Sequence, residues 1–518
     1  MKNLGLDTSS FRKLRENNKI YVDKTKWIHN LITQGESYFL SRPRRFGKSL
    51  TISTLKELFK GYKGLFKGLY IENKWEFKEY PLFIFDFSGI ENSTPEILYQ
   101  SLREKLFGFY RDYKINAREE HNLSALFSGL IFSLHEKFNE KVVILVDEYD
   151  KPILDHVGSG SDEMEIAKKN RYLLKSFFGV LKESQVVDFL QFVFVTGVSR
   201  FTKVSIFSEW NNLQDITMHP LYADFLGYSK EEIISYFEDY LYRFCDTQGM
   251  DTEECLEKIA FWYNGYRFSP KTTAKVFNPI SLMYCLNRMD FDNYWFSTAT
   301  PSFLVNLLKK KDYPIMDMEN LESDLDILET FDIENIQIET LLFQTGYLTI
   351  KDINEDFVYL AYPNEEVKKS FTKILMRDLT KNNTTITLAK KLGRAFENKN
   401  FARVETCLNE IFNLIPYTLY QKADEKYFHT IIYLALSLSG YYATTEVLTS
   451  KGRLDMALFY PDVIYILEFK CNRSAREGLE QIKTKEYAAK YKKEGKKIIL
   501  CSINFDRNEK KVKKIIFE

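Results

Sequence analysis

Residues 38–49 read YFLSRPRRFGKS, and this stretch decides the fold of the N-terminal part of the chain. Its first three residues are apolar, as in a buried strand, and the amphipathic pattern over 50–59 predicts a helix directly afterwards. A strand, a loop ending in Gly47-Lys48-Ser49 and a helix follow each other in the order of a P-loop. In such a loop, backbone N–H groups hold phosphate oxygens, the lysine reaches the β- and γ-phosphates, and the serine hydroxyl ligates Mg²⁺.

The loop departs from the P-loop pattern at one position, because Arg42 stands where the first glycine is expected. We assign Arg45, Phe46, Gly47, Lys48 and Ser49 to nucleotide binding. The sequence leaves two roles open for the loop arginines at positions 42, 44 and 45, which either hold phosphate or bind acidic neighbours.

Three further apolar segments, at 82–86, 142–146 and 192–195, have the composition of strands that are buried on both faces of a parallel sheet. Asp147 and Glu148 follow the second of these segments. We expect Asp147 to lie in the Mg²⁺ shell and Glu148 to polarise the attacking water. Thr196 follows the third segment, where a polar side chain can sense the γ-phosphate.

Other polar residues near these strand ends have two interpretations each. Arg200 and Arg267 are candidate transition-state arginines, with an ordinary salt bridge as the favoured alternative. Asp150 either takes part in the chemistry or caps the following helix. These alternatives stay open at the level of sequence.

Length and charge limit the class of protein. At ~150 residues per domain, 518 residues predict two to four domains. Lys and Arg number 72 and so do Asp and Glu, which excludes a uniformly basic nucleic-acid coat but not a local basic channel. Residues 1–60 carry thirteen basic and five acidic residues (+8), residues 483–518 carry twelve and five (+7), and residues 311–366 carry two and fifteen (−13). Basic ends suit phosphate handling, although solvated lysines explain the tail equally well.

Cysteine spacing and hydropathy predict a cytoplasmic protein. The six cysteines lie far apart and form no C-x-x-C pair, which favours reduced thiols. The N-terminus lacks a signal-peptide pattern, and no apolar run approaches the ~20 residues that span a bilayer. The 15% of aromatic residues favour large cores built from stiff side chains.

From residue 423 onwards, the pattern predicts a helix, three strands, a helix and a strand. The second and third strands flank a turn at 460–463. If Pro461 and Asp462 are its central residues, Asp455 lies directly opposite Glu468, and Lys470 points to the same face. The same counting around the preceding turn, at 450–451, places Glu446 opposite Asp455. A shift of one residue in either turn would break these alignments.

Carboxylates that interrupt apolar strands on one sheet face indicate a divalent-metal site for phosphodiester hydrolysis. Asp455 and Glu468 offer hard oxygen ligands for Mg²⁺ or Mn²⁺. Lys470 is expected to orient or help deprotonate the attacking water, or to stabilise the transition state. The alternative is a charged hairpin that is satisfied by cross-strand salt bridges.

Asp455, twelve intervening residues and Glu468-Phe469-Lys470, in this order of elements, resemble the PD-(D/E)XK nuclease superfamily. The N-terminal half is similar to the AAA-ATPase-like family that is often fused to such a domain. The similarity rests on YVDKT (21–25), RPRRFGKS (42–49), WYNGYRF (262–268) and PNEEV (363–367). The arginine-containing loop is typical of that family, so Arg42 does not imply that nucleotide binding is lost.

The resemblance implies a bacterial ATPase–nuclease fusion that uses ATP and Mg²⁺ (or Mn²⁺), with DNA favoured over RNA as its partner and homo-oligomeric assembly left open. In the superfamily, the first acidic residue comes from the first helix, here Glu425, or from a neighbouring strand, here Glu446, which we prefer. Gln481 matches a polar accessory position on the second helix, and a helix-surface glutamine is the equal alternative. His429 matches a family position for which a structural role is favoured.

We therefore predict an α/β protein with an AAA-like P-loop ATPase domain over 1–230, a helical lid and connector over 231–375, and a restriction-endonuclease-like domain over 376–518. Two functions compete. The first is an ATPase with metal-dependent nuclease activity at Asp455, Glu468 and Lys470, gated or assisted by ATP at Lys48, Asp147 and Glu148. The second is a nucleotide-gated switch whose C-terminal domain binds nucleic acid or a protein without cutting.

Overall fold

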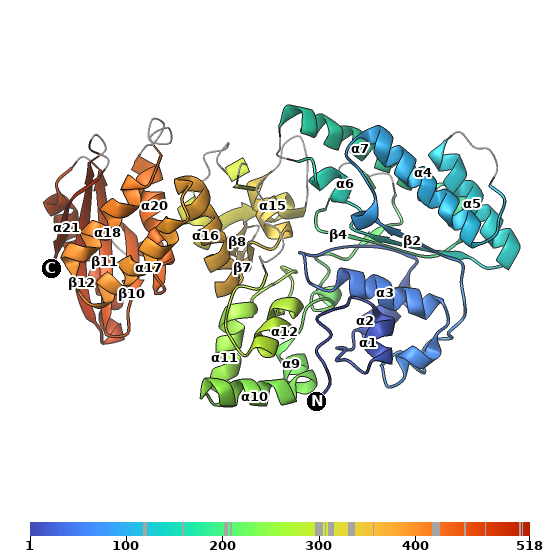
Figure 1. Cartoon of the computed structure of the whole chain (residues 1–518), viewed down its shortest axis with the longest axis horizontal. Helices are drawn as coiled ribbons and strands as arrows, with labels where there is room; N and C mark the ends of the chain where they lie inside the picture. Colours follow the sequence, from blue (N-terminus) through green and yellow to red (C-terminus); the bar gives the residue numbers. More distant parts are fainter. Residues whose placement is uncertain are drawn as a thin grey trace. The chain divides into compact units, whose positions relative to one another are not determined.

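The computed structural model describes the chain except for residues 118–121, 158–159, 201–205, 208–209, 296–303, 306, 309–314, 330–336, 356, 417–424, 450–451, 472, 507–508 and 510, together with the side chains of 316–317, 327, 425–426, 442, 445–449 and 452–453. The chain forms two compact units (Figure 1). The first unit comprises Met1–Thr298 and Glu322–Glu366, and the second comprises Ala299–Leu321 and Val367–Glu518. The predicted division at residues 230 and 375 remains a prediction.

The first unit is built on a parallel sheet with the strand order β2-β3-β4-β1-β5. Its strands are β1 (Ser37–Ser41), β2 (Leu82–Asp86), β3 (Val142–Asp147), β4 (Leu190–Gly197) and β5 (Gln214–Asp215). Every pair of neighbours is parallel, and all residues of β1 and β3 are buried. Continuous apolar runs are typical of strands covered on both faces, so the predicted α/β class is confirmed.

Helices cover both faces of this sheet, with α4, α5 and α7 on one side and α1, α2 and α3 on the other (Figure 1). The helices of this layer system are α1 (Phe11–Glu16), α2 (Thr25–Gln34), α3 (Lys48–Phe59), α4 (Pro95–Asp112), α5 (Leu123–Phe138), α6 (Lys151–Leu154), α7 (Ser161–Gly179) and α8 (Ser184–Val187). The predicted strand, loop and helix around residues 38–59 are therefore β1, the phosphate loop (42–47) and α3.

A helical subdomain completes the first unit. It contains α9 (Lys230–Tyr236), α10 (Glu238–Gln248), α11 (Thr252–Tyr263) and α12 (Pro279–Arg288). Leu4 and Val22 from the N-terminal segment are buried in the same apolar cluster as these helices, which ties the start of the chain to the subdomain. A small sheet, with the order β6-β8-β7, and two helices follow: β6 (Leu321–Asp324), α14 (Leu325–Glu329), α15 (Ile338–Gln344), β7 (Thr349–Asn354) and β8 (Phe357–Ala361).

The second unit is a mixed sheet with the order β13-β12-β11-β10-β9, in which only β11 and β12 are parallel. Its elements are α16 (Glu365–Thr380), α17 (Thr384–Glu397), α18 (Phe401–Asn413), α20 (Glu425–Ser437), β9 (Tyr442–Thr449), β10 (Gly452–Phe459), β11 (Val463–Cys471), α21 (Ala475–Thr484), β12 (Lys497–Asp506) and β13 (Lys511–Phe517). The predicted helix, three strands, helix and strand are α20 to β12, and β13 was not anticipated. Short 3-10 turns complete the chain at Lys63–Phe66, Phe87–Gly89, Val180–Lys182, Pro220–Tyr222, Ile315–Glu319 and Tyr487–Glu494.

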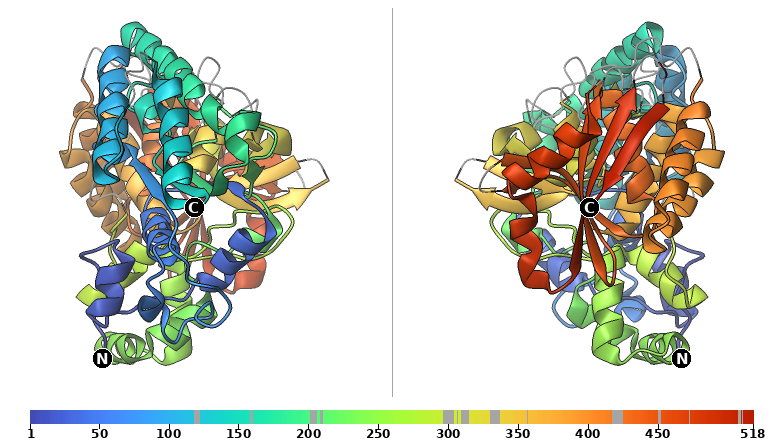
Figure 2. Two further views of the ribbon diagram at one scale, coloured as in Figure 1. Left: turned by 90° about the vertical axis from the view of Figure 1, so that its right-hand side faces the viewer. Right: turned by 90° about the vertical axis from the view of Figure 1, so that its left-hand side faces the viewer.

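Alternate residues of β11 face opposite layers. Tyr465 donates a hydrogen bond to the carbonyl of Phe396 in α17, whereas Ile464 and Ile466 pack against Ile482 of α21. The two layers are visible on either side of the sheet in Figure 2 (right). Because side chains alternate along a strand, Glu468 and Lys470 belong to the α21 face.

The aromatic residues build the cores, as predicted. Phe85, for example, packs edge-on against Phe109, Phe127 and Phe177, with ring centroids 5.3–5.4 Å apart. None of the six cysteines, all of which the structure describes, forms a disulfide. Among the described helices, none has the length and apolar character needed to cross a membrane.

Candidate functional site: a phosphate loop and a carboxylate–lysine hairpin

The phosphate loop has a backbone that turns sharply at two residues. Gly47 (φ 95°) and Arg45 (φ 70°) lie in the left-handed region, and α3 begins at Lys48 directly after Gly47. A left-handed conformation is strained for residues with a side chain, so glycine is the residue expected at position 47. The loop therefore brings the N-terminus of a twelve-residue helix to the end of β1.

Lys48 is held inside this loop. Its Nζ donates to the carbonyl oxygens of Arg42 (3.0 Å) and Pro43 (3.1 Å), and burial lowers its pKa against the opposing charges of Asp147, Asp150 and Glu148. A buried ammonium whose partners are carbonyls is poorly compensated. Phosphate oxygens would be stronger partners for the same three donors.

The predicted Mg²⁺ residues Ser49 and Asp147 lie close to each other. Burial raises the pKa of Asp147, whereas the Ser49 side chain and the charge of Lys48 oppose this shift. Asp147 ends β3 and stands beside Asp86 at the end of β2. Hard oxygen donors at the foot of a phosphate loop fit a Mg²⁺ ion that also binds phosphates.

Glu148 combines a strained backbone with a perturbed carboxyl group. It has φ 53°, its N–H donates to Asp147 Oδ1 (3.1 Å), and burial is the main cause of its raised pKa. Its side chain lines the same cavity as Lys48 and Ser49. Left-handed residues other than glycine concentrate at functional sites, and a raised pKa suits a proton acceptor.

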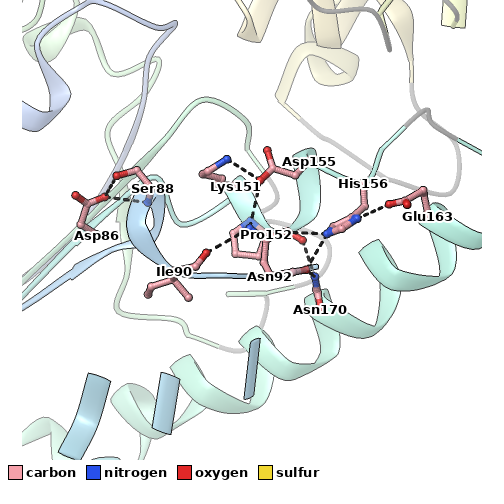
Figure 3. A network of polar contacts seen from close by, with 10 residues as sticks. All are labelled: Asp86, Ser88, Ile90, Asn92, Lys151, Pro152, Asp155, His156, Glu163 and Asn170. Carbon is pink, nitrogen blue, oxygen red and sulfur yellow. Dashed lines mark hydrogen bonds and ion pairs between the residues drawn. The ribbon is translucent and has the colours of Figure 1, made fainter. Parts of the chain in front are cut away.

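A polar network fixes the chain that leaves Glu148 (Figure 3). His156 faces Glu163 through Nδ1 (2.5 Å) and the Asn92 carbonyl through Nε2 (2.8 Å), while Asn170 donates to the carbonyls of Asn92 (3.1 Å) and Pro152 (2.8 Å). These bonds join α6, α7 and the loop after β2. The segment after Glu148 is consequently held by two other parts of the unit, α7 and the loop after β2.

Asp150 takes neither of its two predicted roles in this structure. Its Oδ2 accepts from the N–H groups of Val198 (3.0 Å) and Ser199 (2.6 Å) and from the Ser199 hydroxyl (2.6 Å). It makes no side-chain bond to the helix that follows it. Asp150 instead joins the end of β3 to the end of β4.

Thr196 and Arg200 bind protein groups rather than lining the cavity. The Thr196 hydroxyl donates to the Leu40 carbonyl (2.8 Å). The Arg200 guanidinium donates to Asp215 Oδ2 (2.6 and 3.0 Å). In this structure Arg200 therefore forms an ordinary salt bridge, which was the favoured alternative. Arg267 likewise donates to the carbonyls of Ser269 and Pro270. The structure does not bring these residues together with Lys48.

The three loop arginines separate into different environments. Arg42 is 1% exposed, donates to the carbonyls of Ser41, Thr217 and Tyr222 (2.7–2.9 Å), and lies over the ring of Phe268. Arg45 donates to the Tyr294 carbonyl (2.5 Å). Arg44 is exposed and lines the cavity. Arg42 thus replaces the missing glycine with a structural anchor.

Replacing this anchor should destabilise the protein. We expect Arg42→Ala to lower the free energy of unfolding by about 3 kcal/mol, because three buried carbonyls lose their donor and a cavity remains. Arg44→Ala is the matched control in the same loop and should stay within about 0.5 kcal/mol. Urea denaturation measures both, and equal destabilisation of the two variants would contradict the assignment.

A cavity of about 390 Å³ adjoins the phosphate loop. Its lining includes the polar residues Lys48, Ser49 and Glu148. It also includes apolar residues of the N-terminal segment, of the loop 225–228 and of the start of α12. Polar and apolar lining residues together suit the phosphates and the base of a nucleotide. The sequence did not predict this apolar lining, because its residues are distant in the chain; Tyr21 and Val22 belong to the YVDKT motif, to which no role was assigned.

In the second unit, both predicted hairpin registers are confirmed. Met456 pairs with Leu467, which is the register that places Asp455 opposite Glu468. Leu454 pairs with Val447 and Met456 with Thr445, so the backbone of Glu446 lies opposite Asp455. The side chains of Glu446 and Glu425 lie outside the described part of the structure. The turn at 460–463 therefore has the length that the sequence indicated, whereas residues 450–451 lie outside the described part of the structure.

The described site residues converge at the end of β11. Lys470 Nζ donates to Glu468 Oε1 (2.7 Å) and to Gln481 Oε1 of α21 (2.9 Å). Asp455 Oδ2 accepts from the N–H of Phe469 (2.8 Å). Gln481 thus contacts the predicted lysine, as an accessory residue would. His429 lies against the ring of Phe469, which points to the other face of the sheet.

Glu468 has an unused oxygen. Its side chain is 2% exposed, and its Oε2 has no hydrogen-bond partner among the residues that the structure describes. Burial, followed by the charge of Asp455, raises the pKa of Glu468 to about 7, and Lys470 opposes this shift. A buried unpartnered carboxylate oxygen is costly in a folded protein. It fits a metal ligand beside Asp455, although the described side chains include no group of three or more candidate ligands.

Gly478 permits α21 to approach this site. A methyl group at position 478 would lie 2.1 Å from Ser502 Oγ and 3.2 Å from Lys470 Cγ. Ser502, the β12 neighbour of Glu468, is fully buried and was not predicted as a site residue. No local signal marks it, because its importance comes from the helix packed over it.

We expect Gly478→Ala to cost about 1–3 kcal/mol in the free energy of unfolding, against the normal helix preference for alanine, because α21 must move outward. That movement should break the Lys470–Gln481 bond. Adding Ser502→Ala removes the oxygen that clashes and should restore most of the lost stability. Thermal denaturation of the single and double variants provides the comparison, and equal stability of both would show that this contact is unimportant.

Comparison with known proteins identifies two domains in this chain. Residues 5–207 match a family described as predicted AAA-ATPase, and residues 423–515 match the PD-(D/E)XK nuclease superfamily. The chain belongs to the family of AAA-ATPase-like proteins that carry a C-terminal PD-(D/E)XK nuclease superfamily domain. It is 34% identical over 538 residues to an Azotobacter chroococcum mcd 1 protein described as "Uncharacterized protein in vnfD 5'region", and the alignment covers 100% of this chain and 99% of that protein.

Proposed function

We propose that the protein is an ATP-binding and ATP-hydrolysing nuclease that cuts DNA, or alternatively RNA, with Mg²⁺ or Mn²⁺, and that nucleotide at the phosphate loop gates or assists cutting. The observation that carries the proposal is the buried carboxylate–lysine–glutamine group of Glu468, Lys470 and Gln481 beside Asp455. The phosphate loop, with Ser49 against Asp147, supports the ATP-dependent part.

In the first unit, each residue has a distinct task. Lys48 exchanges the carbonyls of Arg42 and Pro43 for phosphate oxygens, and the N-terminus of α3 adds its amides and dipole. Ser49 and Asp147 would hold Mg²⁺, which supplies charge neutralisation to the phosphates. Glu148 is placed to orient a water and accept its proton. Thr196 and Arg200 remain candidate γ-phosphate residues that would first have to leave Leu40 and Asp215.

In the second unit, Asp455 and Glu468 would hold a divalent ion, with Glu446 as our preferred further carboxylate. Such an ion activates water and polarises the phosphodiester. Lys470 places a positive charge at the same point and can stabilise the developing negative charge or assist removal of a proton from water. Gln481 and Glu468 fix the orientation of this lysine.

The test is cleavage of labelled single- and double-stranded DNA and RNA with Mg²⁺ or Mn²⁺, with and without ATP. Wild type should cut at least one substrate, Glu468→Ala should not, and Lys48→Ala should lose the response to ATP. Intact substrates in every reaction, with ATP still hydrolysed, would reject the nuclease. That result would favour a nucleotide-gated switch.

A further inference from the structure

Two residues of the phosphate loop that line the cavity, Arg45 and Phe46, also contact residues far along the chain. Arg45 donates to the Tyr294 carbonyl, and the ring of Phe46 packs edge-on against Tyr266 (4.8 Å) and Phe268 (5.2 Å). Tyr294 is 249 residues from Arg45 in the chain. The loop that would bind phosphate is therefore joined directly to a distant segment of the same unit.

Glu366 holds that segment from its other side. Its Oε1 accepts from the N–H groups of Tyr294 (2.6 Å) and Trp295 (2.8 Å). The side chain is fully buried. Burial raises the pKa of Glu366 to about 7, whereas the Ser281 side chain, the two amides and the charge of Arg45 favour its ionised form. Arg45 and Glu366 thus bind opposite ends of the peptide group that joins Tyr294 to Trp295: Arg45 binds its carbonyl and Glu366 binds its N–H.

A second contact places the neighbours of Glu366 against the loop that packs on Phe46. Asn364 donates to the Asn264 carbonyl (2.8 Å). Gly265 has φ 103°, and a methyl group there would lie 2.0 Å from the Pro363 carbonyl oxygen, so the two segments touch through their backbones. The PNEEV and WYNGYRF motifs, which the two catalytic sites leave unexplained, meet at this point.

The chain passes from this junction into the second unit. Glu366 is the last residue of the first unit and the second residue of α16. Two residues later, Lys368 donates to the Ala443 carbonyl of β9 (3.2 Å) and pairs with Glu319 (2.6 Å). β9 carries Glu446 and pairs with the strand of Asp455. The first residues of α16 thus belong to the first unit, and within the second unit the same helix contacts β9 through Lys368.

We propose that Glu366 is a positioning residue that transmits nucleotide binding at the phosphate loop to α16. Phosphate is a competing acceptor for Arg45, so its arrival weakens the Arg45–Tyr294 bond and alters the Glu366 bonds to Tyr294 and Trp295. The first turn of α16, which contains Glu366, then changes its stability. This inference rests on the proposed ATP binding and assigns the route by which nucleotide acts on the C-terminal unit.

Hydrogen exchange on the full chain tests this route, with ADP and a non-hydrolysable ATP analogue as probes. In wild type, nucleotide should change the exchange rate of the Tyr294 and Trp295 amides and of the first turn of α16 by roughly tenfold. In Glu366→Gln, which keeps an oxygen acceptor but removes the charge, nucleotide should still bind within about threefold of wild type and the α16 response should disappear.

Glu365→Gln is the matched control, because it removes the neighbouring charge from the same helix turn, and it should keep the response. A variant Glu366→Gln that responds like wild type would overturn the inference. If that variant fails to fold, the comparison of wild type with and without nucleotide still tests the inference. Bound nucleotide that leaves the exchange rates of residues 294–295 and α16 unchanged would overturn the proposed route but not the proposed function. Absence of nucleotide binding to wild type would instead overturn the proposed function.

Discussion

Glu468→Gln should reduce metal-dependent cleavage by about 10²–10³-fold while leaving the fold intact. Glutamine keeps the shape of the side chain but lacks the negative charge that a divalent cation requires. Glu468 Oε1 is bonded to Lys470 and Oε2 has no partner, so the substitution removes the ligand without breaking a bond made by Oε2. Cleavage rates and Mn²⁺ affinity, measured on the same preparation, are the two readouts.

Glu480→Gln is the appropriate control for this experiment, because Glu480 is exposed and precedes Gln481 on α21. It should cut at the wild-type rate. Equal thermal stability of the two variants would show that any loss in Glu468→Gln is chemical. Undiminished cleavage in Glu468→Gln would show that the hairpin is not the active site.

Lys48→Ala should lower ATP affinity by about 10–100-fold, since a charge-assisted hydrogen bond contributes about 1.5–3 kcal/mol. Hydrolysis should fall further, by about 10²–10³-fold, because negative charge develops on the phosphates in the transition state. Calorimetric titration with ATP and a phosphate-release assay separate the two effects.

Lys60→Ala, an exposed lysine directly after α3, is the control for the loss of a positive charge near the same helix and should bind ATP normally. The ammonium of Lys48 is buried against two carbonyls, so its removal should leave the protein folded. Unchanged ATP affinity in Lys48→Ala would mean that the loop does not bind phosphate.

Much of the architecture could be predicted because it depends on short-range patterns. The apolar runs at 82–86 and 142–146 became β2 and β3, and the turn at 460–463 set the register that aligns Asp455 with Glu468. A strand has a period of two residues and a tight turn has a fixed length, so neighbours within about twenty residues can be paired by counting. Gln481 was singled out only by the family resemblance, and its contact with Lys470 is known from the structure.

The roles of the polar residues around the phosphate loop were harder to predict from the sequence. Arg42, Arg44 and Arg45 are almost adjacent in sequence, yet Arg42 is buried on carbonyls of residues 217 and 222, whereas the other two line the cavity and Arg45 also binds Tyr294. Thr196 and Arg200 were chosen for their position at a strand end, and their partners are Leu40 and Asp215. Local pattern identifies such residues but not the acceptor that each one meets.

The sequence by itself determined that the chain contains a parallel P-loop sheet and a carboxylate–lysine hairpin, because both depend on residues that are close together in the chain. Only the tertiary structure decided that Gly478 is needed for the close approach of α21, and that Glu366 and Arg45 hold one peptide group between them. These contacts join residues 24 to 249 positions apart. They depend on how whole elements pack, and packing is set by the sum of many side-chain volumes and not by any single motif.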